Sequence, residues 1–183
     1  MLERIIDACC LINLYASGNE DSILQACGEF WISTQVRNEA LCIRRVDEND
    51  PTRLVTQDID LGHAIAAGHI QTCQLEGQNE TDAFVRFAMQ LDDGEASCVA
   101  IAKSRGWTMA TDDRKARRIA SESGISLIST PEVIQRWVGV TSPSKVAIVE
   151  LLQRIERFAG FRPRRTDPLH QWWVTLSAKG NDC

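Results

Sequence analysis

Carboxylates are the most abundant groups in this chain that could do chemistry, and several follow predicted strands. The chain has 25 Asp and Glu residues but only three His residues and one Tyr. Asp7 closes the segment ERIID, and Asp112 with Asp113 follows the segment WTMAT. Ligands of open parallel sheets bind at the carboxyl ends of the strands, so these side chains would share one crevice if the two strands are close neighbours. Glu39 and Glu95 lie on predicted helices and would line the same crevice if those helices face it.

A divalent metal ion is the ligand that such a crevice predicts. Without a cation, converging carboxylates repel one another and lose hydration, which raises their pKa values. The sequence has no CxxC pair and no His at zinc-finger spacing, which favours Mg²⁺ or Mn²⁺ over zinc. For any one carboxylate, helix capping is an equal alternative. Capping alone would not call for so many acidic groups at one edge.

Basic residues follow the acidic pair. Arg114 and Arg117 are neighbours on a predicted helix and would either bind RNA phosphate beside the metal or form solvated surface. A second basic run lies in the tail, together with two tryptophans. It would either form a stacking platform for single-stranded RNA or, as is commoner, a solvated turn and a packed helix. This tail set comprises Arg162, Arg164, Arg165, Trp172 and Trp173.

The elements that would position these residues alternate between strand and helix. Strands are predicted over 3–7, 29–33, 107–111 and 125–130, with helices between them, including one over 34–45 with Val36, Ala40 and Ile43 along one side. Between 46 and 79 the pattern is least legible. This alternation predicts an α/β fold with a parallel sheet. Past Pro131, two more helices are expected, and the apolar stripe of the second, over 144–158, either packs on the domain or joins two subunits.

Length and composition fit one well-buried domain, with room for an appended piece in 183 residues. The net charge of −5 argues against a general nucleic-acid coat protein, although an acidic metal site suits a nuclease. No run approaches the ~20 apolar residues of a membrane span, and Glu3 and Asp7 interrupt the start where a signal peptide is apolar. Most of the seven scattered cysteines are expected to be buried and reduced. We therefore expect a cytoplasmic location and no membrane partner.

The acidic segments resemble those of a known family. The relevant stretches are IIDACCLINLYASG, then QVRNEAL, then LDDGEASCVAIAKSRGWTMATDDRKARRIASESGISLIST. They are similar to the PIN-domain family, in the branch of the VapC-like toxin nucleases, over roughly residues 3–140. The resemblance implies a three-layer α/β sandwich with a central parallel sheet, and an acidic site that uses Mg²⁺ or Mn²⁺ to cleave RNA. It places a nuclease domain at 1–140 and leaves 141–183 as a helical C-terminal extension.

The resemblance also implies roles for single residues. Cys9 stands where family members often have Ser, Thr or Asn, and a thiol is a poor partner for Mg²⁺, although Asn13 could compensate one turn along. The catalytic positions of the family match Asp7, Glu39, Glu95 and Asp112, and the metal ligands match Asp7, Glu95, Asp112 and Asp113.

Three functions remain open at this level. The first is a metal-dependent endoribonuclease that acts on RNA as the toxin of a toxin–antitoxin pair, with an antitoxin protein and a homodimer as further partners. The second is a catalytically inactive PIN-like module for protein or RNA binding. The third is a phosphotransfer enzyme with Asp7 as nucleophile. It is weaker because such a site needs a second aspartate two residues after the first, and Cys9 stands there.

Overall fold

The computed structural model describes residues 3–39, 41–47 and 49–178 of the chain, which fall into two compact units. The first unit comprises the described residues of Met1–Leu11, Gly28–Ala40 and Asp60–Thr130. The second unit comprises those of Ile12–Cys27, Leu41–Ile59 and Pro131–Cys183. Each unit is therefore assembled from segments that are far apart in the sequence.

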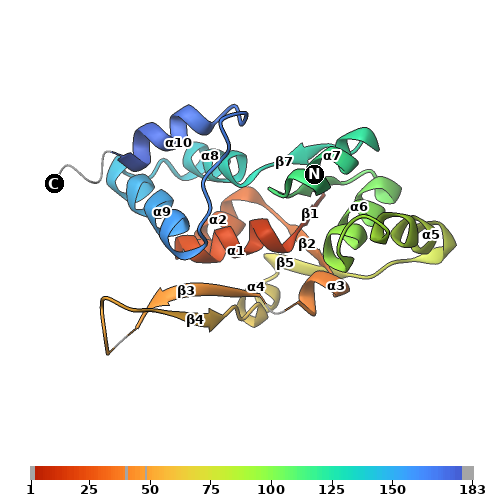
Figure 1. The fold of residues 1–183 in the computed structure, drawn as a ribbon, viewed down its shortest axis with the longest axis horizontal. Coiled ribbons are helices and arrows are strands. Elements are labelled where there is room, and N and C mark those ends of the chain that lie inside the picture. Colours follow the sequence, from red (N-terminus) through yellow and green to blue (C-terminus); the bar gives the residue numbers. More distant parts are fainter. Residues whose placement is uncertain (1–2, 40, 48, 179–183) are drawn as a thin grey trace. The chain divides into compact units, whose positions relative to one another are not determined.

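A five-stranded parallel sheet forms the centre of the first unit (Figure 1). The strand order is β5-β2-β1-β6-β7, so β1 lies between β2 and β6. Ile6 of β1 pairs with Ala110 of β6, which confirms the premise that the strands before Asp7 and Asp112 are neighbours. The α/β prediction is confirmed as well. The strands span β1 Arg4–Ile6, β2 Phe30–Ser33, β5 Ile70–Cys73, β6 Thr108–Ala110 and β7 Leu127–Ile128.

Helices flank this sheet, and α6 is the central one. It contacts β1, β2 and β6, and its residues from Ala96 to Ala102 are all buried. Small side chains dominate this run, so the helix backbone can approach the sheet closely. α5 packs against α6, and α7 packs against β7. The helices of the first unit span α3 Thr34–Arg37, α4 Gly62–Ala66, α5 Gly77–Ala88, α6 Asp93–Arg105 and α7 Arg114–Glu122.

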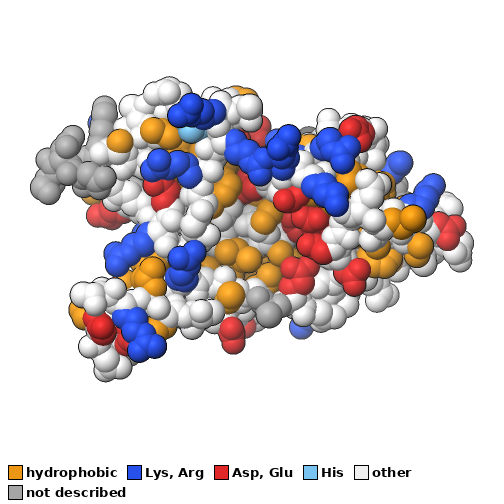
Figure 2. All heavy atoms as spheres, in the orientation of Figure 1, with side chains coloured by type: hydrophobic (Ala, Val, Ile, Leu, Met, Phe, Trp, Pro, Cys, Tyr) orange, Lys and Arg blue, Asp and Glu red, His pale blue; other side chains and the backbone are white. Residues whose placement is uncertain are grey.

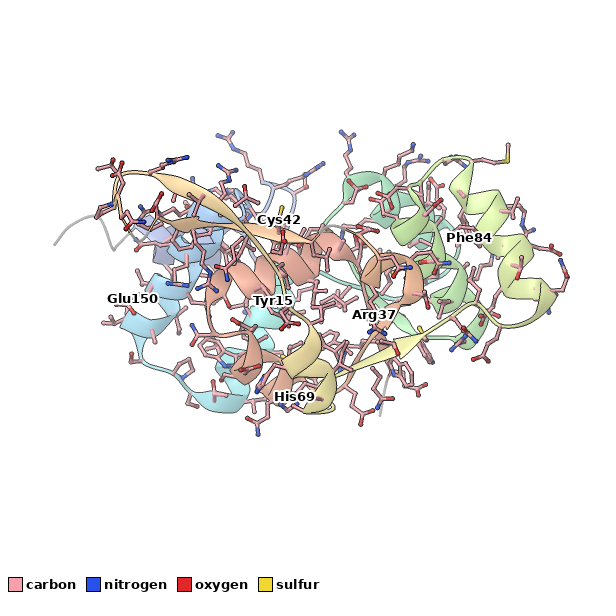
Figure 3. The ribbon with its side chains drawn as sticks, turned by 90° about the horizontal axis from the view of Figure 1, so that it is seen from below. Tyr15, Arg37, Cys42, His69, Phe84 and Glu150 are labelled. Carbon is pink, nitrogen blue, oxygen red and sulfur yellow. The ribbon has the colours of Figure 1, made fainter. Side chains whose placement is uncertain are left out.

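The second unit combines helices with an antiparallel hairpin of β3 (Cys42–Val46) and β4 (Leu54–Asp58). Figure 3 labels the exposed Cys42 at the start of β3. The apolar stripe of α9 is buried, and α9 contacts β3 and α10, so the stripe packs inside this unit. α1 and α8 begin in the first unit and continue in the second. The helices here are α1 Ala8–Ser17, α2 Glu20–Cys27, α8 Thr130–Thr141, α9 Lys145–Phe158 and α10 His170–Ser177.

One predicted helix is wrong. The helix predicted over 34–45 ends at Arg37, and Cys42–Val46 forms β3 instead. Ile43 is buried between two exposed neighbours. This alternation has the two-residue period of a strand, and the segment pairs with β4. Ala40, which the prediction placed along the helix, lies outside the described residues.

Of the two interpretations of the tail, the structure favours the packed helix over the RNA-stacking platform. Trp173 is fully buried, and its indole N–H donates to Glu156 Oε1 at 2.8 Å. Arg162 pairs with the same carboxylate, with 2.7 Å between Nη2 and Oε2. Trp173 packs edge-on against Phe161, so its ring is not accessible to a nucleobase.

Candidate active site

Asp7 is the most deeply buried carboxylate of the predicted set. Its backbone N–H continues the β1–β6 pairing by donating to Ala110 O at 2.9 Å. The side chain is held at both oxygens, because Ala8 N–H donates to Oδ1 at 2.8 Å and the Thr111 hydroxyl donates to Oδ2 at 2.9 Å. The Cys9 thiol also donates to Oδ2, at 3.1 Å. With 2% of its surface exposed, Asp7 has one fixed orientation at the carboxyl end of the central strand.

Glu95 and Glu39 meet at the start of α6. Asp92 caps this helix by accepting from the N–H of Glu95 at 2.8 Å. A Cβ built on Gly94 would collide with Oε1 of Glu39, so the carboxylate of Glu39 occupies the space that any other side chain at position 94 would fill. Glu39 is therefore placed against the backbone of the helix turn that carries Glu95.

A pair of buried serines connects α3 to α6 and thereby positions Glu39. The Ser33 hydroxyl accepts from Val36 N–H at 3.1 Å and caps α3. The Ser97 hydroxyl makes short hydrogen bonds of 2.7 Å to Ser33 Oγ and to Gly94 O. Both serines are fully buried. α3 is only one turn long and Glu39 follows its end. The hydrogen bond between the two serines therefore helps to fix the position of Glu39.

Burial and mutual repulsion raise the pKa values of these three carboxylates. Burial is the largest cause for each, and the charge of Asp92 is the largest electrostatic contribution. The pKa of Asp7 is raised, and those of Glu39 and Glu95 are raised to about 7. Asp92 was missed in the sequence. Its capping position at a helix start gave it an ordinary structural role there, and its nearness to the other three depends on the fold.

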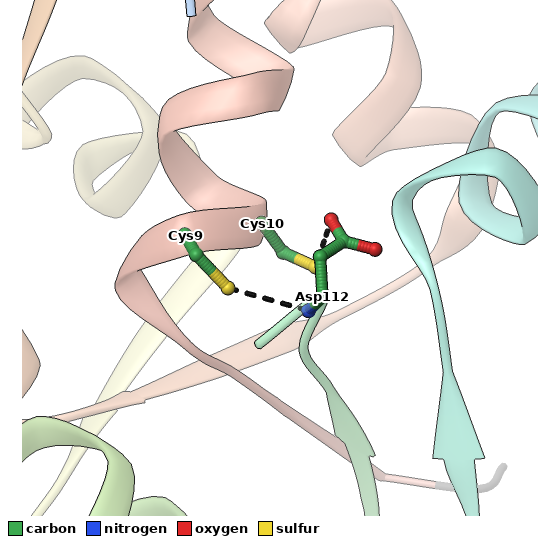
Figure 4. Close-up of side chains that lie close together, drawn as sticks. All are labelled: Cys9, Cys10 and Asp112. Atoms are coloured by element: carbon green, nitrogen blue, oxygen red, sulfur yellow. Dashed lines mark hydrogen bonds between the residues drawn. The ribbon is translucent and has the colours of Figure 1, made fainter. Parts of the chain in front are cut away.

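Asp112 is engaged differently, as Figure 4 shows. Thr130 N–H donates to Oδ1 at 3.0 Å, and the Thr130 hydroxyl donates to Oδ2. The Cys10 thiol also donates to Oδ2, at 3.1 Å, and the backbone N–H of Asp112 donates to Cys9 Sγ at 3.3 Å. The carboxylate therefore lies at the start of α8 and in contact with the Cys10 thiol, while Cys9 contacts the backbone of the same residue.

The adjacent Asp113 serves as the N-cap of α7. Its Oδ1 accepts from the N–H groups of Lys115 and Ala116, at 2.7 and 2.9 Å. Arg117, on the same helix, donates from Nη1 to Thr111 O at 2.8 Å, whereas Arg114 is exposed. Figure 2 shows acidic side chains gathered on the face where β1, α6 and α7 lie, with Lys and Arg side chains beside them.

Two groups at this edge of the sheet differ in their donor atoms. Asp7, Glu39 and Glu95 supply oxygens only, the donors that Mg²⁺ and Mn²⁺ prefer, and each lies close enough to other carboxylates for their charges to raise its pKa. Among the described residues, the ligand atoms of one group of three lie within 4.8 Å of one another, and that group is Cys9, Cys10 and Asp112. Burial raises the pKa of Cys10 well above its usual value, and a protonated thiol does not suit a hard ion.

Comparison with known proteins gives a family but no individual relative. A family described as PIN domain matches residues 3–162 of the chain. The match includes every predicted site residue and runs past residue 140 into α9. Neither the curated proteins nor the solved structures gave a match.

Proposed function

The chain belongs to the PIN-domain family, and from this we propose that it is a metal-dependent endoribonuclease that hydrolyses RNA phosphodiester bonds. The supporting observation is the group of Asp7, Glu39 and Glu95, whose pKa values are raised by burial and by neighbouring carboxylates. Perturbed carboxylates that converge at the carboxyl ends of parallel strands are typical of a functional site.

The proposed metal ligands keep oxygen donors in suitable positions. Asp7 is already oriented by three donors. Asp113 caps α7 through Oδ1, so a cation can bind at its other oxygen without ending the helix. Thr130 donates to both oxygens of Asp112 and so orients this carboxylate as well. The full proposed ligand set is Asp7, Glu95, Asp112 and Asp113, with Mg²⁺ or Mn²⁺ as the ion.

Glu39 is the proposed proton acceptor. A bound Mg²⁺ or Mn²⁺ would supply polarisation of a phosphoryl oxygen and acidification of a water molecule. With a pKa of about 7, Glu39 can take up and release a proton near neutral pH, which is where a general base is most effective. Its contact with Gly94 places its carboxylate beside the helix turn that carries Glu95.

RNA is the proposed substrate, and two arginines are proposed to attract it. Arg114 is exposed at the start of α7, where a phosphate would also meet the positive end of the helix dipole. Arg117 donates to Thr111 O, so its guanidinium lies next to the strand end that supports Asp7. Cations beside the carboxylates would offset the repulsion between an acidic site and a polyanion.

The finer assignments belong to the same proposal. The resemblance of the acidic segments to VapC-like nucleases supports a toxin of a toxin–antitoxin pair, with an antitoxin protein and a homodimer as further partners. A cytoplasmic location goes with this role. In the described part of the chain, no helix has both the length and the apolar character of a membrane span. The division into a nuclease domain at 1–140 and a helical extension at 141–183 also remains a proposal.

Cleavage of a labelled single-stranded RNA by the purified protein tests the proposal. We expect cleavage with Mn²⁺ or Mg²⁺, none with EDTA, and loss of cleavage in Asp7→Asn and Asp112→Asn. Asp82→Asn is the matched control, because Asp82 is an exposed carboxylate on α5 that bonds only locally to Gln78. Equal cleavage by Asp7→Asn and Asp82→Asn would rule out the proposed active site.

The alternative of an inactive PIN-like binding module has one observation in its favour. Asp112 and Asp113 both accept hydrogen bonds from helix N-termini, which is a sufficient structural role for each. Thermal unfolding with added Mn²⁺ separates the two functions, because an ion that binds the folded state raises its stability. An unchanged melting temperature at millimolar Mn²⁺, together with intact RNA, would favour the binding module.

A further inference from the structure

Cys9 and Cys10 are adjacent in the first turn of α1, and both thiols point toward Asp112 (Figure 4). The Cys10 Sγ to Asp112 Oδ2 distance is 3.1 Å, and Cys9 Sγ accepts from the Asp112 N–H at 3.3 Å. The two sulfurs and a carboxylate oxygen lie within 4.8 Å of one another. Adjacent cysteines do not have the spacing of a known zinc motif, so only the fold brings this donor set together.

The chemistry of the set differs from that of the neighbouring carboxylates. A tetrahedral Zn²⁺ holds sulfur and oxygen ligands about 3.6 to 3.8 Å apart, and the three ligand atoms here lie within 4.8 Å of one another. Two thiolates with one carboxylate suit a thiophilic cation, whereas Mg²⁺ and Mn²⁺ prefer oxygen. The Thr130 hydroxyl contacts both Asp112 Oδ2 and Cys10 Sγ, so the group has the supporting contact that orients ligands in metal sites.

We propose that Cys9, Cys10 and Asp112 form a binding site for a thiophilic divalent cation, of which Zn²⁺ fits best, and that the bound ion withholds Asp112 from Mg²⁺ or Mn²⁺. The second part rests on the proposed function; the first part does not. On binding, each of the two thiols releases its proton to solvent and the carboxylate is already ionised, so the set carries three negative charges against the two positive charges of the ion. Water fills the fourth coordination position.

Titration of the metal-free, reduced protein with Cd²⁺ tests the site without any enzymatic assay. Cd²⁺ bound to thiolates absorbs in the ultraviolet, so one equivalent should produce this band in the wild-type protein. Cys9→Ser should weaken binding by about tenfold or more, since even the loss of a supporting contact costs 10- to 100-fold in metal affinity. Cys42→Ser is the matched control, because Cys42 is an exposed thiol of the hairpin. Equal titrations for wild type and Cys9→Ser would overturn the proposal.

A second measurement uses the wild-type chain and does not depend on whether a variant folds. Zn²⁺ should slow the reaction of Cys9 with iodoacetamide, mapped by mass spectrometry, and leave Cys42 as reactive as before. Cys9 is partly exposed and Cys42 is exposed, so both can react in the native protein. Equal alkylation of Cys9 with and without Zn²⁺ would overturn the site.

The inhibitory part is measured on RNA cleavage. Zn²⁺ should lower the Mn²⁺-dependent rate of the wild-type protein, and Cys9→Ser should keep a larger fraction of its own zinc-free rate. The failures are distinguishable. Thiolate-dependent Cd²⁺ binding in a protein that cleaves no RNA refutes the proposed function and leaves the cation site standing. Cleavage with no such binding refutes the cation site alone.

Discussion

Two regions of the first unit bury carboxylates whose pKa values are shifted in opposite directions. On α5, Glu80 is 4% exposed and accepts two hydrogen bonds from Arg105, at 2.8 and 2.9 Å. These bonds are the main reason that its pKa is lowered. At the sheet edge, Asp7 is equally buried, yet its pKa is raised, mainly because burial disfavours its charge.

The difference separates structural carboxylates from carboxylates kept for a ligand. A buried charge without a counter-ion costs free energy that the fold has to offset. Glu80 avoids that cost because the chain supplies a guanidinium. For Asp7, Glu39 and Glu95, the neighbouring charges that shift the pKa values are those of other carboxylates. A cation from solution would neutralise them, so metal binding should matter at one region and not at the other.

The largest effect is expected for Glu80→Gln. The change removes the closer of the two carboxylates that pair with Arg105, leaving the longer pair with Glu76, and breaking such a pair costs about 2 to 3 kcal/mol when one partner is partly exposed. Chemical denaturation should show this loss, while the affinity for Mn²⁺ stays unchanged. A variant as stable as the wild type would mean that the ion pair is not what makes burial of Glu80 tolerable.

Gly94→Ala is expected to lower the rate of RNA cleavage and to leave stability nearly unchanged. The new methyl group would displace the carboxylate of Glu39, and misplacement of a catalytic group by about an ångström costs up to ~100-fold in rate. Glu39 is at the surface and can rotate away, so the melting temperature should hardly change. A rate within twofold of the wild-type rate would exclude Glu39 as the proton acceptor.

The pH dependence of stability should also distinguish the two regions. The folded-state pKa values of Glu39 and Glu95 are about 7, above the ordinary value of 4.5. Their contribution to stability is therefore fully present below pH 4.5 and is lost as the pH rises through 7. After allowance for solvent screening, we expect the melting temperature of the metal-free protein to fall by about 2 to 4 °C across this window. Mn²⁺ should abolish the fall, and a fall that Mn²⁺ leaves unchanged would argue against metal binding there.

The smallest effect is expected for Glu39→Gln, compared above pH 7 without metal. Removing one of the repelling charges should raise the free energy of unfolding by about 0.5 kcal/mol, given the exposure of this side chain. Calorimetry at pH 8 measures the change, and the same variant should cleave RNA more slowly. If Glu39→Gln destabilised the protein, Glu39 would have a structural role like that of Glu80.

Much of the fold follows from the sequence because local patterns decide it. The apolar run before Asp7, the helix that Gly106 ends in the left-handed conformation, and the alternation of strand and helix all predict a parallel sheet. The segment at 42–46 does not, because the strand depends on pairing with 54–58. The two interpretations of Trp173 stayed open at the sequence level for a similar reason, since its partner Glu156 is set by how α10 packs on α9.

The site was predictable to a lesser degree. The rule on strand ends predicted that Asp7 and Asp112 share an edge of the sheet if their strands are neighbours, and the sheet order meets that condition. Which way each carboxylate turns depends on partners that no spacing reveals. Thr111 holds Asp7, and Thr130 and Cys10 hold Asp112. Asp92 and the pair of thiols were missed because a cap and two adjacent cysteines have ordinary roles in most chains.

The hydrogen bond from the Thr130 amide to Asp112 makes this amide proton a reporter of cation binding at the carboxylate. A cation that binds this carboxylate changes the charge that the amide proton faces, so the nuclear magnetic resonance signal of the amide should move. A spectroscopist could follow occupancy there in solution, without RNA, label or mutation, and rank cations by the concentration at which the signal changes.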